Sequence, residues 1–396
     1  MTGAVDDAIE PLRFSFVRGG PIFNAQRALG LMPNGTLGIG RRIAAVIAVT
    51  WLPIVLLAWL DGRMLEGVAQ EPLLRHHGIH ARLLLALPTF IVAEAVLDGA
   101  AFMLIPHFET SGLVDDKLRP PFRDALRGVE RLRDSRLAAA VIVGLVVLNA
   151  VFNWGESQHL DETSWALLAD GRPGLTIAGW WYLGVARPIF ALALFLWLWR
   201  LWLVGSLCRR IAHLDLRLVP THPDRAGGLG FLELLPVAFA PVAFGASAVL
   251  ASRWGHDVVY HGTHVDDLRM PIAVFVVIAL VAFLSPLAPF SGMLRRLKRR
   301  ARLQYGSLFA HHGRMVHQRW ILRQPVPDHA LLDAPELGPV ADVISAYAAI
   351  EAIRPAPVRR APLVALVAAL ALPLVVMAAI EVPIVELLKT VARALV

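Results

Sequence analysis

Two carboxylates lie within a long apolar segment of the chain, where ionisable side chains are rare. Glu94 and Asp98 are four residues apart in the run 83–105, so a helix over this run places both on one face. A charged group inside a membrane is unfavourable unless it is paired or hydrated, and such residues often serve ion or proton transfer. The two carboxylates therefore indicate either a polar route through the membrane or a static ion pair between helices.

The cations that could pair with these carboxylates lie in another apolar run, 175–203. Counting about 1.5 Å of helix rise per residue from the membrane edge places Arg200 at the depth of Asp98 and leaves Arg187 within reach of Glu94. We therefore predict an intramembrane polar cluster of Glu94, Asp98, Arg187 and Arg200. An arginine that extends along its helix to the headgroups is the alternative.

A string of unusual composition, HPDRAGGLGFL at 222–232, precedes the fifth apolar run. Its glycines would let backbone amides approach an anion, and its charged side chains could bind a phosphate or a lipid headgroup. The string lacks the GxxxxGKS or GxxxxGKT pattern of a phosphate loop. A tight turn with an aspartate cap and glycines for close packing explains the same residues. Both interpretations concern His222, Asp224, Arg225, Gly227, Gly228 and Gly230.

The two interpretations of this string make different demands on its residues. An anion site needs the charges of Asp224 and Arg225, whereas we expect a packing turn to tolerate their loss. A packing turn needs the small size of Gly228, so valine at this position should prevent folding. We favour the packing turn.

Histidines are concentrated in the loops expected outside the membrane, which hold 7 of the 14. His256, His261 and His264 lie near three aspartates, and imidazole with carboxylate suits zinc, copper or nickel. Their spacing fits no standard metal site, so these histidines are weak metal candidates. Solvated loop residues and protonation near neutral pH are the alternatives. No cofactor is predicted.

Motifs of soluble enzymes are absent from the sequence. It contains no GxSxG, HExxH or CxxC, which argues against the serine-hydrolase, zinc-protease and dithiol chemistry that these motifs support. No catalytic residue is therefore assigned.

Composition indicates which elements must position these side chains. Of 396 residues, 57% are hydrophobic and 17% are charged, with a mean hydropathy of +0.59, which excludes a soluble globular protein. Seven apolar runs are long enough to cross about 30 Å of hydrocarbon. We predict an all-α polytopic membrane protein whose seven transmembrane helices cover 43–60, 83–105, 137–154, 175–203, 233–252, 270–290 and 361–383.

Lysine and arginine are unevenly distributed, with 28 in the connections expected inside and 8 in those expected outside. The positive-inside rule then predicts an inner N-terminus and an outer C-terminus, which agrees with an odd number of spans. Four parts follow: a cytoplasmic N-terminal segment, a six-helix membrane core, a cytoplasmic basic amphipathic region, and a seventh helix with a short outer tail. Their ranges are 1–42, 43–290, 291–360 and 361–396.

The basic region contains a predicted amphipathic helix, 294–323, with apolar side chains at steps of three or four and six cations within 295–302. It could lie on the anionic inner leaflet, where each cation contributes about 1 kcal/mol. It could instead continue the sixth span into the cytoplasm, or only fix the topology. The expected partners are therefore the lipid bilayer, anionic inner-leaflet lipids, and a second copy or another protein through 294–323. Nucleic acid is not expected.

Two segments, HPDRAGGLGFL at 222–232 and YGSLFAHHGRMVHQRW at 305–320, resemble those of a group of bacterial multi-pass inner-membrane proteins without an assigned activity. The resemblance covers roughly the second half of the chain. It implies a location in the bacterial inner (cytoplasmic) membrane, and it supplies neither an activity nor a site.

Three functions remain open. A transporter or channel would use the intramembrane polar cluster. An assembly or sensory partner would use the basic helix and needs no pocket. A membrane-embedded enzyme that handles lipid or phosphate would use His222, Asp224 and Arg225. We rank transport first and the enzyme last. A water-lined cavity that reaches Glu94 would favour transport, whereas a dry, paired cluster would favour the assembly partner.

Overall fold

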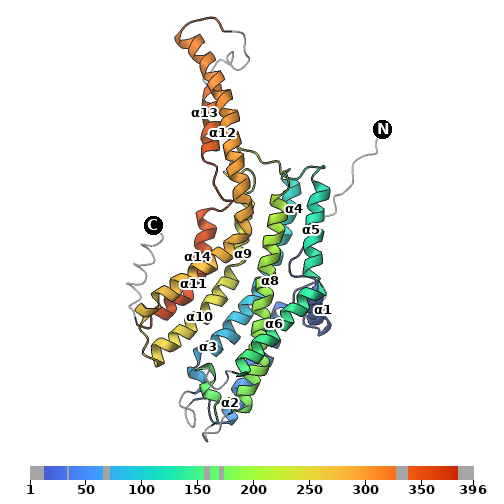
Figure 1. The fold of residues 1–396 in the computed structure, drawn as a ribbon, viewed down its shortest axis with the longest axis vertical. Coiled ribbons are helices and arrows are strands. Elements are labelled where there is room, and N and C mark those ends of the chain that lie inside the picture. The colour runs from blue at the N-terminus through green and yellow to red at the C-terminus, as the bar shows by residue number, and fades with distance from the viewer. Residues whose placement is uncertain are drawn as a thin grey trace, which may run out of the picture.

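The computed structural model describes residues 13–33, 35–65, 72–155, 161–168, 174–326 and 338–381. The regular elements of these residues are helices, which form an elongated bundle with a thinner projection at one end (Figure 1). The all-α prediction is therefore confirmed.

The α-helices, in chain order, are α1 Gly20–Ala28, α2 Ile39–Leu60, α3 His77–His80, α4 Leu87–Thr110, α5 Arg119–Arg133, α6 Arg136–Gly155, α7 Ile177–Trp181, α8 Arg187–Ala212, α9 Leu234–Ala238, α10 Ala240–Tyr260, α11 Arg269–Leu284, α12 Ala288–Val316, α13 Gly338–Glu351 and α14 Arg360–Ala378. Short π-helical turns join α3 to α4 at η2 Ala81–Ala86 and α7 to α8 at η4 Tyr182–Ala186, and a third extends α12 at η8 His317–Ile321. Short 3₁₀ turns lie at η1 Leu73–Arg75, η3 Asp161–Ala166, η5 Gly230–Glu233, η6 Val265–Leu268 and η7 Ser285–Leu287.

Six helical stretches of the described residues are long and apolar enough to cross a membrane, or seven if α5 and α6 count as one span bent by 42°. Each of the seven predicted apolar runs overlaps one of these stretches, and residues 382–383 of the last run lie outside the described residues. Among these stretches, 77–110 has 34 residues and 177–212 has 36. At about 1.5 Å per residue they extend about 51 and 54 Å, well beyond a hydrocarbon core of about 30 Å. Both helices must therefore continue outside the bilayer.

The bundle has two distinct ends. At the end called here the basic end, α4 and α8 finish, α5 begins and α12 departs (Figure 1). At the opposite end, called the histidine end, α2 and α10 finish and α3 begins. A large apolar cluster around Phe108, Phe122 and Phe290 fills the basic end. A second cluster around Trp165 and Tyr182 fills the histidine end. The basic end is therefore a folded region in its own right.

Small residues bring the last described helix, α14, close to α10. Ala243, Ser247, Ala251 and Gly255 recur every four residues of α10 and are all buried. This spacing places them on one face, where small side chains let two membrane helices approach. The Ser247 hydroxyl donates to the carbonyl of Leu370 in α14 at 2.5 Å. The chain therefore returns to the bundle after the projecting region.

The projection, called here the arm, is built from α12, η8 and α13 (Figure 1). The predicted helix 294–323 lies in it and continues α11 after the break at η7, so it extends the helix of the sixth apolar run. The base of the arm is fixed by a small core of Ala301, Ile350 and Ile353. Lys298 Nζ also donates to the carbonyl of Glu351 at 2.5 Å.

Candidate functional site

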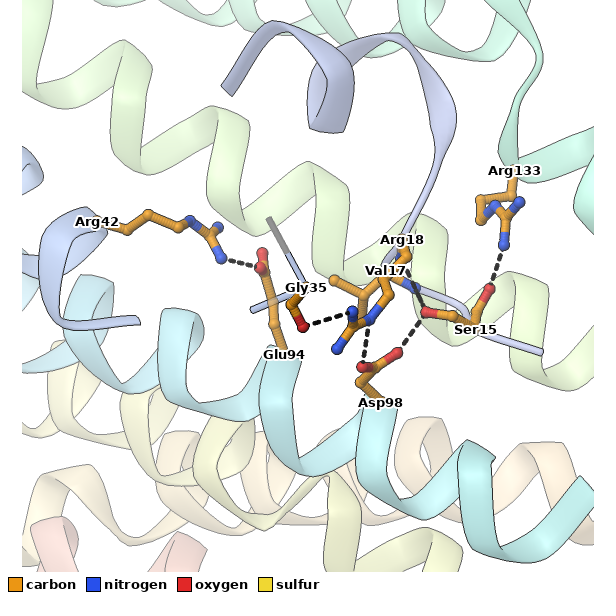
Figure 2. A network of polar contacts seen from close by, with 8 residues as sticks. All are labelled: Ser15, Val17, Arg18, Gly35, Arg42, Glu94, Asp98 and Arg133. Atoms are coloured by element: carbon orange, nitrogen blue, oxygen red, sulfur yellow. Dashed lines mark hydrogen bonds and ion pairs between the residues drawn. The ribbon is translucent and has the colours of Figure 1, made fainter. Parts of the chain in front are cut away.

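Glu94 is the most deeply buried carboxylate of the predicted cluster, with 5% of its surface exposed. Arg42 at the start of α2 donates to Glu94 Oε2, and Arg200 in α8 lies 2.9 Å from Oε1 through its Nη2. Arg42 is itself 4% exposed, and the Arg200 guanidinium also lies over the Trp197 ring, 5.1 Å from its centroid. One carboxylate of α4 thus connects three helices (Figure 2 shows the contact with Arg42).

The predicted pairing of Glu94 with Arg187 is wrong, because the two guanidinium groups on Glu94 come from Arg42 and Arg200. Arg187 is the first residue of α8, 13 residues before Arg200. Depth counted along an axis locates Cα atoms, whereas a helical side chain is tilted toward the N-terminus of its helix. The Arg200 side chain therefore extends back along α8 to Glu94, which the helix-rise estimate had placed nearer to Arg187 at the start of α8.

Asp98, one turn further along α4, binds the N-terminal segment instead of α8 (Figure 2). The Ser15 hydroxyl donates to Asp98 Oδ1 at 2.5 Å, and Arg18 Nε donates to Oδ2 at 2.8 Å. Arg133 Nη1 at the end of α5 donates to the carbonyl of Ser15 at 2.5 Å. The predicted match of Asp98 with Arg200 is therefore wrong too, because the polar groups of the N-terminal segment occupy this carboxylate.

The network lies toward one end of the apolar helices. Arg42 precedes the exposed Trp59 of the same helix by 17 residues, or about 26 Å at about 1.5 Å per residue. Tryptophan commonly marks a membrane interface. Glu94 and its two arginines therefore lie near the basic end of the apolar helices.

A cavity of about 50 Å³ adjoins Glu94 and is lined in part by the N-terminal segment, including Phe16 and Phe23. A cavity needs only about 10–15 Å³ of this kind of volume to hold one water, so there is room for water beside Glu94. Both Glu94 oxygens are bound by guanidinium groups. This arrangement is therefore best suited to stabilise the packing of α2, α4 and α8 against one another.

The string at 222–232 forms a tight turn organised by one side chain. The Asp224 carboxylate accepts hydrogen bonds from the backbone N–H groups of Ala226 at 2.7 Å, Gly228 at 3.0 Å and Gly230 at 2.7 Å. His222 Nδ1 lies 2.8 Å from the same carboxylate. Burial opposes ionisation of Asp224, but these hydrogen bonds outweigh it and hold the pKa below its ordinary value.

This geometry supports the packing turn and changes one expectation about it. The amides that an external anion would need already bind Asp224, and a Cβ at Gly228 would lie 3.1 Å from Leu113. The backbone N–H of Arg354, which follows α13, donates to the carbonyl of Arg225 at 2.8 Å. These contacts favour a different expectation: loss of the Asp224 charge should weaken the turn, because this carboxylate closes it.

The three histidines proposed as metal ligands do not meet at one point. His264 Nδ1 lies 2.8 Å from Glu381 Oε1, and the hydrogen bond with this carboxylate raises the His264 pKa. His256 is instead stacked on His76, with ring centroids 5.1 Å apart, and His261 lies 5.4 Å from the His256 ring. Within the described ranges, no group of three or more His, Cys, Asp or Glu could hold a metal ion.

Sequence reasoning missed several members of the polar network. Arg42, Ser15 and Arg18 lie outside the apolar runs in which we searched for partners. Arg82, directly before the run 83–105, is 8% exposed, donates to the Tyr182 hydroxyl and lies over the Phe190 ring. The available signal was the excess of arginine at the ends of apolar runs.

Comparison of the chain with models of known protein families gives no match, and no curated protein or solved structure matches it either. The resemblance to a bacterial inner-membrane group stays a prediction.

Proposed function

We propose that this chain is an integral protein of a bacterial inner membrane that docks an acidic cytoplasmic protein on its arm. The polytopic helical architecture and the excess of arginine at the basic end support an inner location for that end. The arm departs from the basic end (Figure 1). The observation that carries the proposal is a projecting helix that is strongly basic and exposes apolar side chains.

The positive charge of the arm indicates what kind of partner surface it would bind. Residues 294–323 contain nine lysines and arginines and no aspartate or glutamate. Charge complementarity favours an acidic surface, and like charges suppress other contacts. A second copy of the chain would bring the same positive helix against this one, so a different, acidic protein fits better.

The tip of the arm adds an apolar anchor to this charge. Leu308, Trp320 and Ile321 are 54, 65 and 69% exposed. Exposed apolar groups beside cations are typical of protein interfaces, where tryptophan and arginine often contribute most of the affinity. The tip therefore offers both a central anchor and a charged rim.

The reach of the arm favours a protein over the membrane surface. Trp320 follows Leu287, at the end of η7, by 33 residues, or about 50 Å of helix at about 1.5 Å per residue. The headgroup region adds only about 5–8 Å to each side of the hydrocarbon. An arm directed away from the apolar helices carries its tip far beyond the lipid headgroups.

Transport through the Glu94 cluster is the second candidate. A buried carboxylate beside a cavity favours it, but the small cavity and the double pairing of Glu94 favour the docking role. Because both Glu94 oxygens are already paired with guanidinium groups, we rank the assembly or sensory partner above the transporter.

Site-specific photo-crosslinking in cells tests the docking role. With a photoreactive phenylalanine at Trp320, we expect one reproducible adduct with a protein whose surface is acidic. Leu29 directly follows α1 and is 76% exposed. The same photoreactive residue at this position should give no such adduct. The purified pair should bind, and Arg314→Glu with Arg323→Glu should weaken binding at least about tenfold.

Reversal of an exposed charge outside the arm, Arg217→Glu, provides the matched control and should leave the affinity unchanged. An adduct between two copies of the chain would contradict the acidic-partner proposal. The absence of any adduct would contradict it too, as would binding that survives charge reversal at the tip.

A further inference from the structure

We infer that a groove at the basic end binds an anionic phospholipid. The groove has a volume of about 920 Å³, with α8 as its floor and α5 and the η7–α12 segment as its walls. Such a volume is large enough for a lipid headgroup and the upper part of its chains, since pockets for small molecules span about 300–1,000 Å³. This inference is independent of the partner proposed for the arm.

The groove has an apolar part and a basic part along α8. Leu198, Leu201 and Trp202 line it on the side of the apolar helices, and Arg209 and Arg210 line it two turns further on. Both arginines are exposed; the Arg209 side chain is open to a ligand, and the Arg210 guanidinium also packs against Gly128 of α5. An apolar wall followed by cations matches the order of acyl chain and phosphate in a phospholipid.

The register of α8 places this transition near a membrane surface. Leu201 follows Trp181 by 20 residues and Arg209 follows it by 28, which corresponds to about 30 and 42 Å at about 1.5 Å per residue. If Trp181 marks one interface, about 30 Å of hydrocarbon ends near Leu201. The Arg209 backbone then lies about 12 Å beyond the hydrocarbon, and its long side chain, tilted toward the N-terminus of α8, points back to the headgroups, where a phosphate would lie.

A second hollow of about 600 Å³ continues the basic part along the arm. It shares His213, Leu214 and Pro289 with the first hollow and adds Arg296 and Arg300 of α12. Four arginines thus surround the continuous groove. Guanidinium groups bind phosphate oxygens in a planar, bidentate manner, so several arginines can hold one phosphate or a headgroup with two.

Acidic groups do not cancel this charge. Asp124, on the α5 wall, is paired with Arg127 at 2.7 Å, and Asp215 is exposed on the rim of the second hollow. The lining therefore remains positive. Because the groove joins this charge to an apolar wall at membrane depth, an anionic phospholipid fits it better than a soluble phosphate compound does.

Native mass spectrometry of the full chain, purified in detergent with added lipid, tests the inference. We expect phosphatidylglycerol to be retained in preference to phosphatidylcholine. Replacing both Arg209 and Arg210 with Gln should lower phosphatidylglycerol retention at least about tenfold, since two charge-assisted contacts are lost. A similar loss is expected for Arg296→Gln with Arg300→Gln, which keeps the inference testable if the first variant does not fold.

Arg295 and Arg299 provide the matched control, because they lie on the same turns of α12, are exposed and do not line the groove. Their replacement with Gln should leave retention unchanged. An equal loss in this control would show non-specific charge attraction and overturn the inference. Unchanged retention in both groove variants would also overturn it. Displacement of the lipid by millimolar glycerol phosphate or inorganic phosphate would assign the site to a soluble phosphate compound.

Discussion

Replacing Glu94 with Gln should lower the free energy of unfolding by about 3–5 kcal/mol, because it leaves two buried guanidinium groups without their shared counter-charge. Arg42 is 4% exposed and Arg200 has an 11% exposed side chain, so water cannot readily replace the carboxylate. Thermal unfolding in detergent, followed by the monodisperse fraction on gel filtration, measures the effect.

Asp98→Asn is the natural comparison for this substitution, because Asp98 pairs with Arg18, whose side chain is 45% exposed. Its loss should be much smaller, about 1 kcal/mol, as for other partly exposed pairs. Adding Arg42→Gln to Glu94→Gln should restore part of the stability, since one uncompensated charge is then removed. A Glu94→Gln protein that melts like the wild type and loses proton or ion flux in liposomes would support the transport alternative.

Gly228→Val should prevent folding or lower stability by more than about 3 kcal/mol, for two reasons that add. Gly228 has a φ of +99°, and an added Cβ would lie 3.1 Å from Leu113. A β-branched residue is a genuine outlier at positive φ, and overpacking alone typically costs about 1–3 kcal/mol. Gly306→Val in α12 is the matched control, because a Cβ there meets nothing within 4 Å.

Asp224→Asn tests the same turn through its hydrogen bonds. Asparagine keeps the size but cannot accept as strongly from three N–H groups, so we expect a loss of about 1–3 kcal/mol. Because the folded-state pKa of Asp224 is depressed, its contribution is present above the ordinary value of about 3.9 and disappears as the pH falls through the folded value. Wild-type stability of both turn variants would contradict this account of the turn.

Much of the fold could be predicted because long apolar runs have few alternatives to spanning helices. The full length of α8 could not be predicted, since its apolar run ends near Leu203 while the helix continues to Ala212. Packing extends it: Leu207 and Ile211 join the apolar core of the basic end, and Arg210 lies against Gly128 of α5. Such tertiary contacts between distant segments are not visible in local hydropathy.

The two carboxylates of the candidate site could be predicted from the sequence, but the residues that pair with them could not. The rarity of intramembrane carboxylates identified Glu94 and Asp98 from sequence alone. Their partners Arg42 and Ser15 precede the first apolar run, and only folding brings them to α4. The turn at 222–230 shows the same limit, because its composition allowed an anion site until the structure placed Asp224 among the amides.

The most direct test of the central claim is to determine on which side of the membrane the arm lies. In a Cys208→Ser background, a cysteine at the exposed Ser307 should resist a membrane-impermeant thiol reagent in spheroplasts and react after permeabilisation. A cysteine at the exposed Asp267, at the histidine end, should react in intact spheroplasts. Labelling of Ser307→Cys from outside, with protection of Asp267→Cys, would contradict a cytoplasmic docking arm.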